Sequence, residues 1–370
     1  MNKSMKKILF IPHHPQVKNG LKIRIPELAR PLAPGNTVFL LNWETVSGDY
    51  TLANRARSCF KDLMKTERQY ADGNLTIVEL PTLHRPLSLA RCFNRRRVMR
   101  FIEDEKIDVV VNGSFELFTM PRERRFRYVY DLADYPPTGL STLTLDELKN
   151  ADVCTVISHE LADYLQLEHG RKSVVIANGA DIAAMRSVRP DEVTELKKRY
   201  HVENKWIIGY VGNIGNWVNF ELAVEAFRRF QLKVPDSALI WIGPSPFLGE
   251  LQKKYAGGSV IFTGQVTGSI EPYFKMLDTG LLCHKASPFQ DRAFHLKLIE
   301  YTAAEKSVVS SPLKESMRLG FPNVLFVEET AEQWADALLK ARNMAWKKEW
   351  NALADNYDWK VIGAQLQALI

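Results

Sequence analysis

Short apolar runs rich in valine and isoleucine recur along this chain and alternate with longer segments of helical period. Such runs are typical of buried strands, and their alternation with helices is typical of a mostly parallel sheet. The alternation stops in a polar, charged stretch, residues 186–204, and then starts again. We therefore predict an α/β protein with two doubly wound, Rossmann-like domains that face each other across a ligand-binding cleft.

The length of the chain agrees with two domains, because 370 residues exceed what one ordinary core holds. We place the first domain at residues 1–170 and the second at residues 171–350. The strands predicted before the charged stretch are residues 7–11, 37–41, 75–80, 108–111, 128–132, 153–157 and 173–176. Those predicted after it are residues 206–211, 238–242, 260–262, 279–283, 307–310 and 324–327.

Positive charge is concentrated in the first part of the chain. Residues 1–150 contain 24 Lys and Arg against 17 Asp and Glu, whereas the remaining residues contain 25 against 26. The densest basic stretches are residues 91–100 and 122–127, and the first is interleaved with apolar side chains. Such a segment can lie on an anionic lipid surface, although a solvated helix face explains it equally well. The basic stretches lack a recognisable nucleic-acid-binding module, so we expect no nucleic acid partner.

No apolar run approaches the roughly 18 residues needed to span a bilayer, and the first residues carry too short an apolar stretch for a secretory signal. We therefore expect a cytoplasmic protein, with peripheral contact at the inner face of the plasma membrane as a further hypothesis. The four cysteines lie far apart and are interpreted as buried thiols. The adjacent His13 and His14 lack further ligands at metal-binding spacing, so we expect no metal and no cofactor.

The segment with the clearest chemistry is residues 286–310. Within it, His295 precedes a helix whose first turns carry Lys297 and Glu300, and a strand of small and β-branched residues follows. A helix N-terminus attracts anions and Lys297 adds a full positive charge, so a diphosphate would bind there. The Glu300 carboxylate could accept hydrogen bonds from both hydroxyls of a ribose. Taken alone, the K-x-x-E spacing is also that of an ordinary surface pair.

Residues 296–309 (LKLIEYTAAEKSVV) resemble the donor-binding segment of GT-B glycosyltransferases of the family 4 type. Three further matches follow the order that the family has: residues 157–181 at the domain junction, residues 206–219, and residues 357–359. The resemblance extends to bacterial exopolysaccharide enzymes, including glucuronosyltransferases of the xanthan-assembly type. It implies that residues 351–370 form a helix that crosses back to the first domain.

The resemblance assigns roles on the donor side. It implies that Lys297 binds the phosphates and stabilises the charge that develops on them, and that Glu300 binds the ribose. The loop with Gly212 and Asn213 would approach the donor closely, since glycine permits such an approach. His295 is expected to line the site as a hydrogen-bond donor.

Three positions depart from the family pattern. Arg292 stands where many retaining members carry a glutamate, so the choice between inversion and retention stays open. Its guanidinium is a candidate partner for the carboxylate of a uronic acid. Glu305 and Ser307 stand where a glycine and a proline are usual, which predicts that the turn after the helix is built differently.

On the acceptor side, residues 130–137 (YDLADYPP) read as a strand end followed by a rigid turn. Asp131 and Asp134 are expected at the carboxyl end of that strand, where a carboxylate could take the proton of an acceptor hydroxyl. The segment resembles the stretch that holds the base in the exopolysaccharide enzymes, and Asp134 is the matching position. A turn-capping role for Asp134 is the alternative. Gly20, in the loop after the first strand, and His159 are further candidates for lining the cleft.

The resemblance implies transfer of a sugar from a nucleotide diphosphate donor, with UDP favoured over GDP, and without a metal. The expected acceptor is a saccharide or a lipid-linked molecule in the synthesis of a surface polysaccharide or glycoconjugate. Two alternatives remain. One is a sugar-nucleotide epimerase of the same fold, and the other is a catalytically silent protein that binds a nucleotide sugar or polysaccharide.

Overall fold

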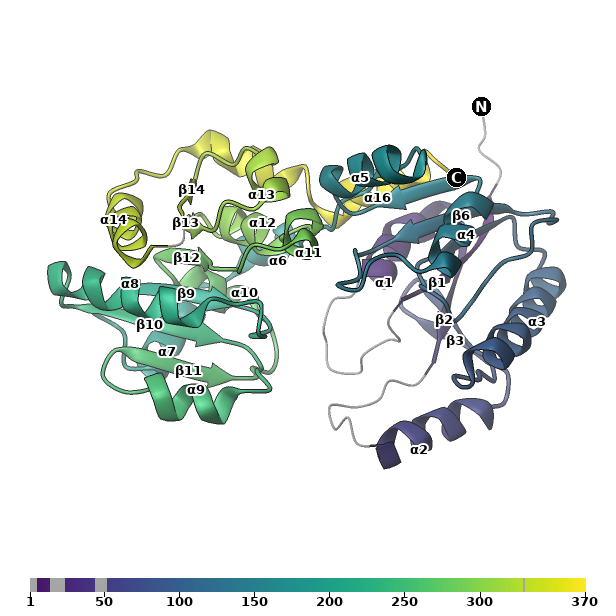
Figure 1. Ribbon diagram of the computed structural model, residues 1–370, viewed down its shortest axis with the longest axis horizontal. Helices are drawn as coiled ribbons and strands as arrows, with labels where there is room; N and C mark the ends of the chain where they lie inside the picture. Colours follow the sequence, from purple (N-terminus) through teal and green to yellow (C-terminus); the bar gives the residue numbers. More distant parts are fainter. Residues whose placement is uncertain (1–4, 14–23, 44–51, 329) are drawn as a thin grey trace. The chain divides into compact units, whose positions relative to one another are not determined.

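The computed structural model of the protein describes residues 5–13, 24–43, 52–328 and 330–370. The chain divides into two compact units, Met1–Gly179 together with Trp359–Ile370, and Ala180–Asp358. The boundaries expected from the sequence, 170/171 and 350/351, lie earlier in the chain than these two points of division. Each unit has one largely parallel sheet flanked by helices (Figure 1), which confirms the predicted pair of doubly wound α/β domains.

The sheet of the first unit has eight strands in the order β3-β4-β2-β1-β5-β6-β7-β8. Its strands are β1 Lys7–Ile11, β2 Thr37–Asn42, β3 Arg68–Asp72, β4 Leu75–Glu79, β5 Val109–Asn112, β6 Arg127–Leu132, β7 Val153–Val156 and β8 Val174–Val175. Every strand predicted for this part of the chain is present, with ends that differ by at most one residue.

The edge strand β3 is absent from the sequence-based prediction. It pairs antiparallel with β4 through a hairpin whose turn contains Gly73, at a φ of 60°. Four of its five residues are exposed, so it buries no apolar face and shows no alternation of apolar and polar residues. The two-residue loop is Gly73-Asn74, a pair that signals a hairpin, and it was the feature of the sequence that could have revealed this strand.

The helices of the first unit include the last helix of the chain. They are α1 Arg24–Ala29, the 3₁₀ helix η1 Arg30–Gly35, α2 Leu52–Leu63, α3 Leu87–Glu105, α4 Thr142–Asn150, α5 His159–His169 and α16 Trp359–Gln367. α16 packs on α1 and η1. Gly363 of α16 lies so close to Pro31 that an added Cβ would be 2.6 Å from the proline ring. This contact requires a residue without a side chain.

A buried ion pair ties α1 to the carboxyl end of the first sheet. Arg24 donates to both carboxylate oxygens of Asp131, at 2.8 and 2.7 Å, and both side chains are almost fully buried. The same guanidinium donates to the backbone carbonyls of residues 176 and 177 and to Asn178, and Thr155 donates to Asp131. Loss of one partner of such a pair costs about 3 to 5 kcal/mol. The network fixes the segment that leads out of the unit, and it favours a structural role for Asp131 over contact with an acceptor.

The sheet of the second unit has six strands in the order β11-β10-β9-β12-β13-β14. Its strands are β9 Trp206–Val211, β10 Ser237–Ile242, β11 Val260–Gly264, β12 Thr279–Leu282, β13 Ser307–Ser310 and β14 Val324–Phe326. All neighbouring strands pair in parallel. Numbered from β9, the order is 3-2-1-4-5-6, that of a dinucleotide-binding Rossmann fold, in which ligands bind where the order reverses.

Helices cover the second sheet, with α8 and α9 beside β10 and β11 in Figure 1. They are α6 Ile182–Ser187, α7 Pro190–Arg199, α8 Phe220–Lys233, α9 Leu248–Tyr255, α10 Glu271–Met276, α11 Pro288–Arg292, α12 Leu296–Ala303, α13 Lys314–Arg318, α14 Ala331–Arg342, η2 Lys348–Trp350 and α15 Asn351–Asp355. Trp241 of β10 packs on Phe220 of α8 with ring centroids 4.1 Å apart. Large apolar side chains thus fill the space between sheet and helices.

The turn after α12 keeps the geometry that a glycine would favour. Glu305 has a φ of 65°, in the left-handed region. The Glu305 N–H donates to the Thr302 carbonyl and the Lys306 N–H to the Tyr301 carbonyl, which is the Schellman arrangement of a helix end. The expectation of a differently built turn is wrong here, because Glu305 adopts the left-handed conformation at a cost of about 1 to 2 kcal/mol.

Candidate functional site

The site in the second unit lies where β9 and β12 end side by side. These two strands pair in parallel and come from the two oppositely wound halves of the sheet. Gly212 directly follows β9, and His284 comes two residues after β12. Parallel strands end at the same edge, so the loops after them converge on one place.

The ammonium group of Lys297 lies directly over the backbone of Gly212. A Cβ added to Gly212 would be 2.6 Å from the Lys297 Cε and 2.8 Å from its Nζ. Gly212 also has a φ of 132°, which other residues rarely adopt. Gly243, after β10, is as restricted, because a Cβ there would be 2.2 Å from the Gly212 carbonyl oxygen. Gly212 therefore makes room for the lysine, and Gly243 makes room for the Gly212 backbone.

Tyr210 lies beneath Lys297 and holds the loop after β9. The Lys297 Nζ is 5.0 Å from the centroid of the Tyr210 ring, a cation–π distance. The Tyr210 hydroxyl is 3.0 Å from the Asn213 carbonyl and 3.1 Å from the His284 Nε2. Burial raises the pKa of Tyr210, and the nearby Lys297 opposes that rise. The phenol thus stays protonated under the lysine.

Two histidines continue this network away from Lys297. The His284 Nδ1 is 2.8 Å from the Gln290 Oε1, and the His295 Nε2 is 2.9 Å from the Gln290 carbonyl. Because a carbonyl only accepts, the His295 Nε2 carries a proton. Burial lowers the pKa of His295 to about 4, and burial together with His295 and Lys297 lowers the pKa of His284 well below its usual value. Both imidazoles are therefore neutral near pH 7.

Helix α12 presents Lys297 and Glu300 on one face. The two residues are three positions apart and both are half-buried, whereas Leu298 and Ile299 between them are fully buried. The neighbouring Tyr301 anchors the helix, because its hydroxyl contacts the carbonyls of β9 and β12 and accepts from the Val211 N–H. The start of α12 and its first two polar side chains thus face the same side as Gly212.

Asn213 and Arg292 flank this cluster. Asn213 is exposed and contributes its backbone carbonyl to Tyr210. Arg292 ends the short helix α11 and donates through Nη1 to the Pro288 carbonyl at 2.9 Å. Its neighbour Asp291 accepts from the Lys314 N–H. The position at which the resemblance led us to expect a glutamate is thus held by a half-buried arginine at the end of α11.

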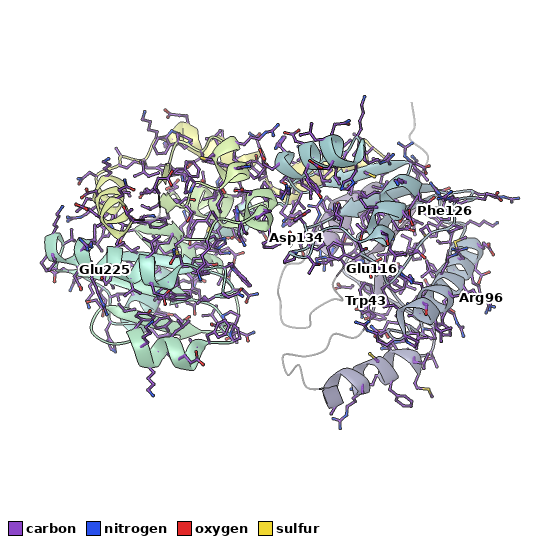
Figure 2. All side chains as sticks on the ribbon, in the orientation of Figure 1. Trp43, Arg96, Glu116, Phe126, Asp134 and Glu225 are labelled. Carbon is purple, nitrogen blue, oxygen red and sulfur yellow. The ribbon has the colours of Figure 1, made fainter. Side chains whose placement is uncertain are left out.

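Two candidate residues of the first unit follow neighbouring strands, Asp134 after β6 and His159 after β7. Asp134 follows β6 and is labelled in Figure 2; burial raises its pKa to about 6, and the Tyr135 N–H that it accepts opposes the rise. His159 is exposed and begins α5, whose N-cap is Ser158. Gly20 lies outside the described residues. None of the groups of His, Cys, Asp and Glu in the described ranges could hold a metal ion.

Four residues of the second-unit site are missing from the sequence-based prediction: Tyr210, Gly243, His284 and Gln290. The sequence could have indicated Gly243, because this glycine follows an apolar strand in the same way as Gly212. Tyr210 and His284 lie in apolar strand-like runs, and the sequence gives no sign that they meet. Gln290 enters the network only through the fold of α11.

Comparison with known proteins agrees with this geometry. Residues 205–343 match the family described as Glycosyl transferases group 1. The chain is 27% identical over 273 residues to TuaH of Bacillus subtilis (strain 168), which is named for glycosyl transfer in teichuronic acid biosynthesis. This alignment covers 66% of the chain and 65% of TuaH, just under two thirds of that relative.

Solved structures match almost the full length. HepE of Anabaena, in complex with UDP and glucose, has a TM-score of 0.68 at 17% identity, over 98% of this chain and 99% of that one. A glycosyltransferase from Rickettsia africae ESF-5 has a TM-score of 0.71 at 14% identity, over 99% and 98%. The chain has the GT-B glycosyltransferase fold. The resemblance to GT-B glycosyltransferases that the sequence indicated is confirmed.

The GT-B fold gives the glycine–lysine cluster its context. The family match, residues 205–343, runs from the start of β9 past the end of α14 and so contains Gly212, Lys297 and Glu300. No helix in the described ranges is long and apolar enough to cross a bilayer.

The buried histidine His295 makes the stability of this protein sensitive to acid. Its pKa in the folded chain, about 4, lies below its unfolded value of 6.5. The unfolded chain therefore binds more protons below pH 6.5, and stability falls by on the order of 3 kcal/mol as the pH drops to 4. We expect unfolding in guanidinium chloride at pH 7 and 4.5 to show this loss, and the His295→Asn variant to show a smaller one. Equal pH dependence in both proteins would contradict the assignment.

Proposed function

We propose that this protein transfers a sugar from a nucleotide diphosphate donor, preferably a UDP sugar, to a saccharide or lipid-linked acceptor in the synthesis of a surface polysaccharide or glycoconjugate. The observation that carries the proposal is the Lys297 ammonium lying over Gly212 where β9 and β12 end, inside a glycosyl transferase group 1 domain. The UDP and glucose bound to HepE and the teichuronic acid assignment of TuaH support the same substrate class.

In this proposal the donor diphosphate lies against Gly212 and the start of α12. Negative charge builds on the diphosphate as the glycosidic bond breaks, and Lys297 with the helix N-terminus would stabilise it without a metal. The neutral Tyr210, His284 and His295 do not add charge beneath it, so the attraction comes from the lysine and the helix. Glu300, one turn further along, would accept from the ribose hydroxyls.

Three substitutions separate these roles in a calorimetric titration. We expect Lys297→Met to weaken UDP binding about ten- to hundredfold while leaving uridine binding unchanged, because uridine has no diphosphate. Glu300→Gln should weaken both ligands. Gly212→Ala should act like Lys297→Met, since its methyl group would displace the lysine.

The matched control for Gly212→Ala is Gly257→Ala. Gly257 has a φ of 128°, close to that of Gly212, but no atom lies within 4 Å of the added Cβ. It therefore introduces the same backbone strain without touching Lys297. The proposal fails if no UDP or GDP compound binds, or if binding survives in the Lys297→Met, Glu300→Gln double variant.

Turnover assays distinguish transfer from the two alternatives. The protein is incubated with a panel of UDP and GDP sugars, with and without membrane extract. Release of the nucleoside diphosphate that depends on the extract supports transfer. Conversion of the sugar nucleotide without extract would indicate an epimerase, and binding without turnover a silent protein. Preference for uronic acid donors, lost in Arg292→Ala, would assign the glucuronosyl specificity.

Asp134 is the proposed base for the acceptor hydroxyl. Its position after β6 and its pKa of about 6 suit a carboxylate that is charged at neutral pH and still basic enough to accept a proton. The neighbouring Asp131 is saturated by Arg24 and does not compete for this role. Deprotonation of the acceptor by Asp134 fits inversion, whereas proton removal by the leaving phosphate would permit retention.

The pH profile of transfer tests the base. The base must be deprotonated, so we expect kcat/KM to fall about tenfold per pH unit below pH 6. Asp134→Asn should lower kcat by about 10² to 10⁴ and abolish this acidic limb. Because burial disfavours the charged form, the variant should be at least as stable as the unaltered protein at pH 7. An acidic limb that persists in Asp134→Asn would assign the titration to another group.

We further propose that the first unit contacts an anionic membrane that carries the acceptor. Exposed apolar side chains occur on α2, directly after it and at the start of α3, with Phe60 64%, Met64 65% and Leu89 61% exposed. Arginines share the solvent side of α3, and Figure 2 shows Arg96 on its outer face. This mixture suits a surface that places charges at lipid headgroups and apolar groups below them.

Vesicle flotation at low salt tests the membrane contact. We expect the protein to float with vesicles that contain anionic lipid and to remain with the soluble fraction for neutral vesicles. The Phe60→Ser, Leu89→Ser variant should lose this preference, whereas Leu232→Ser on α8 of the second unit, at a residue 84% exposed, serves as the control. Equal flotation with anionic and neutral vesicles would exclude the proposed contact with an anionic membrane.

A further inference from the structure

A basic pocket lies at the amino ends of the strands of the second unit's sheet, opposite the end where Gly212 and Lys297 meet. It has a volume of about 460 Å³ and is lined by residues at or just before the starts of β9, β10 and β12, together with one residue each of α7 and α14. We call it the amino-edge pocket; its lining is Lys197, Asn204, Lys205, Trp206, Lys233, Val234, Pro235, Asp236, Asp278 and Arg342. It is separated from Gly212 by the length of the six-residue strand β9, about 20 Å. It therefore cannot be part of the proposed donor site.

The lining carries more positive than negative charge. Four lysine and arginine side chains face two aspartates. Within the described part of the chain, neither Lys197 nor Lys205 comes within 4.0 Å of a carboxylate, while Lys233 pairs with Asp336. One carboxylate oxygen of Asp278 already accepts a hydrogen bond from the Ile207 backbone N–H, at 2.7 Å. The ammonium groups are thus only partly neutralised by the protein.

The pairing of β12 with β13 places a further lysine, Lys306, at this end of the sheet. Thr279 of β12 pairs with Ser307 of β13, which places Asp278 and Lys306 next to each other before the two strands. Burial, helped by Lys275 and Lys197 and opposed by Asp278 and Glu305, lowers the pKa of Lys306 to about 8. Burial also lowers the pKa of Lys275. Burial is the main cause of this low pKa, and an anion bound beside Lys306 would favour its protonated form.

An aromatic ring forms one wall of the pocket. Trp206, the first residue of β9, is half-buried, and the guanidinium of Arg342 lies over its ring at 5.5 Å from the centroid. This stacking holds the planar guanidinium at the pocket, where it can bind an oxyanion through two parallel hydrogen bonds. Lysines supply mobile point charges beside it, the combination that suits phosphate groups.

We propose that the amino-edge pocket binds a phosphate- or diphosphate-bearing anion at a site separate from the one formed by Gly212 and Lys297. Arg342 orients the oxyanion, and Lys197 and Lys205 neutralise it. Bound anion also stabilises the charged form of Lys306. Binding near pH 8 is therefore coupled to the uptake of protons.

Pyrophosphate titrated into the Lys297→Met protein tests the proposal, because that background removes the lysine of the donor site. We expect binding at a single site, with a heat at pH 8 that changes between buffers of different ionisation enthalpy. Adding Lys205→Ala and Lys306→Met should weaken affinity about tenfold or more, the effect of one lost charge-assisted hydrogen bond, and should remove the buffer dependence. The control is Lys253→Ala in the same background, because Lys253 is exposed and outside the lining. This variant should change neither the affinity nor the buffer dependence.

A parallel arm uses vesicles that contain phosphatidic acid, since a lipid headgroup carries the same chemistry. Binding of pyrophosphate assigns the pocket to a soluble anion. Vesicle binding that depends on Lys205 and Lys306, without a pyrophosphate heat, assigns it to a headgroup. The proposal is overturned if Lys297→Met alone abolishes all binding of pyrophosphate and the vesicle arm shows no dependence on Lys205 and Lys306. It is equally overturned if the added Lys205→Ala and Lys306→Met changes leave both arms unaltered.

Discussion

The contact between the Lys297 side chain and the bare backbone of Gly212 is the constraint on which the second unit's site depends. A cation can lie on the end of β9 only where no Cβ occupies that space. The turn after β10 presses on the same glycine through Gly243, so the position of the loop is set from both sides. The groups below the lysine remain neutral, since burial raises the pKa of Tyr210 and lowers those of His284 and His295. One fixed positive charge therefore faces outward over a neutral layer, which is what binding of a diphosphate requires.

In the first unit, burial gives two neighbouring aspartates opposite characters. Asp131 lies in the interior strand β6, and Arg24 donates to both of its carboxylate oxygens as well as to residues 176–178. Asp134, three residues later, is also largely removed from water, but its pKa is raised by that burial and opposed only by the Tyr135 N–H. The first carboxylate therefore stabilises the fold, and the second retains the basicity that a proton acceptor needs.

Positive side chains lie at both the carboxyl and the amino ends of the strands of the second sheet, for different reasons. At the carboxyl edge, one lysine is placed by glycines and a helix start. At the amino edge, several lysines and Arg342 gather because the residues before parallel strands lie side by side. Asp278, which binds the Ile207 backbone, offsets only part of this charge. The same sheet thus has positively charged side chains at both ends of its strands, and the two groups share no residue.

The sequence by itself determined the parallel strands, the two doubly wound domains and the helix with Lys297 and Glu300, because buried strands and amphipathic helices leave local patterns of apolar residues. It did not reveal β3, whose exposed residues bury no apolar face, nor the left-handed turn at Glu305, where the glycine signal is missing. Only the tertiary structure decided which aspartate is paired, which tyrosine and histidines lie beneath Lys297, and which lysines meet at the amino edge. Those relations join residues far apart in the chain, and burial and charge depend on all the neighbours that folding brings together.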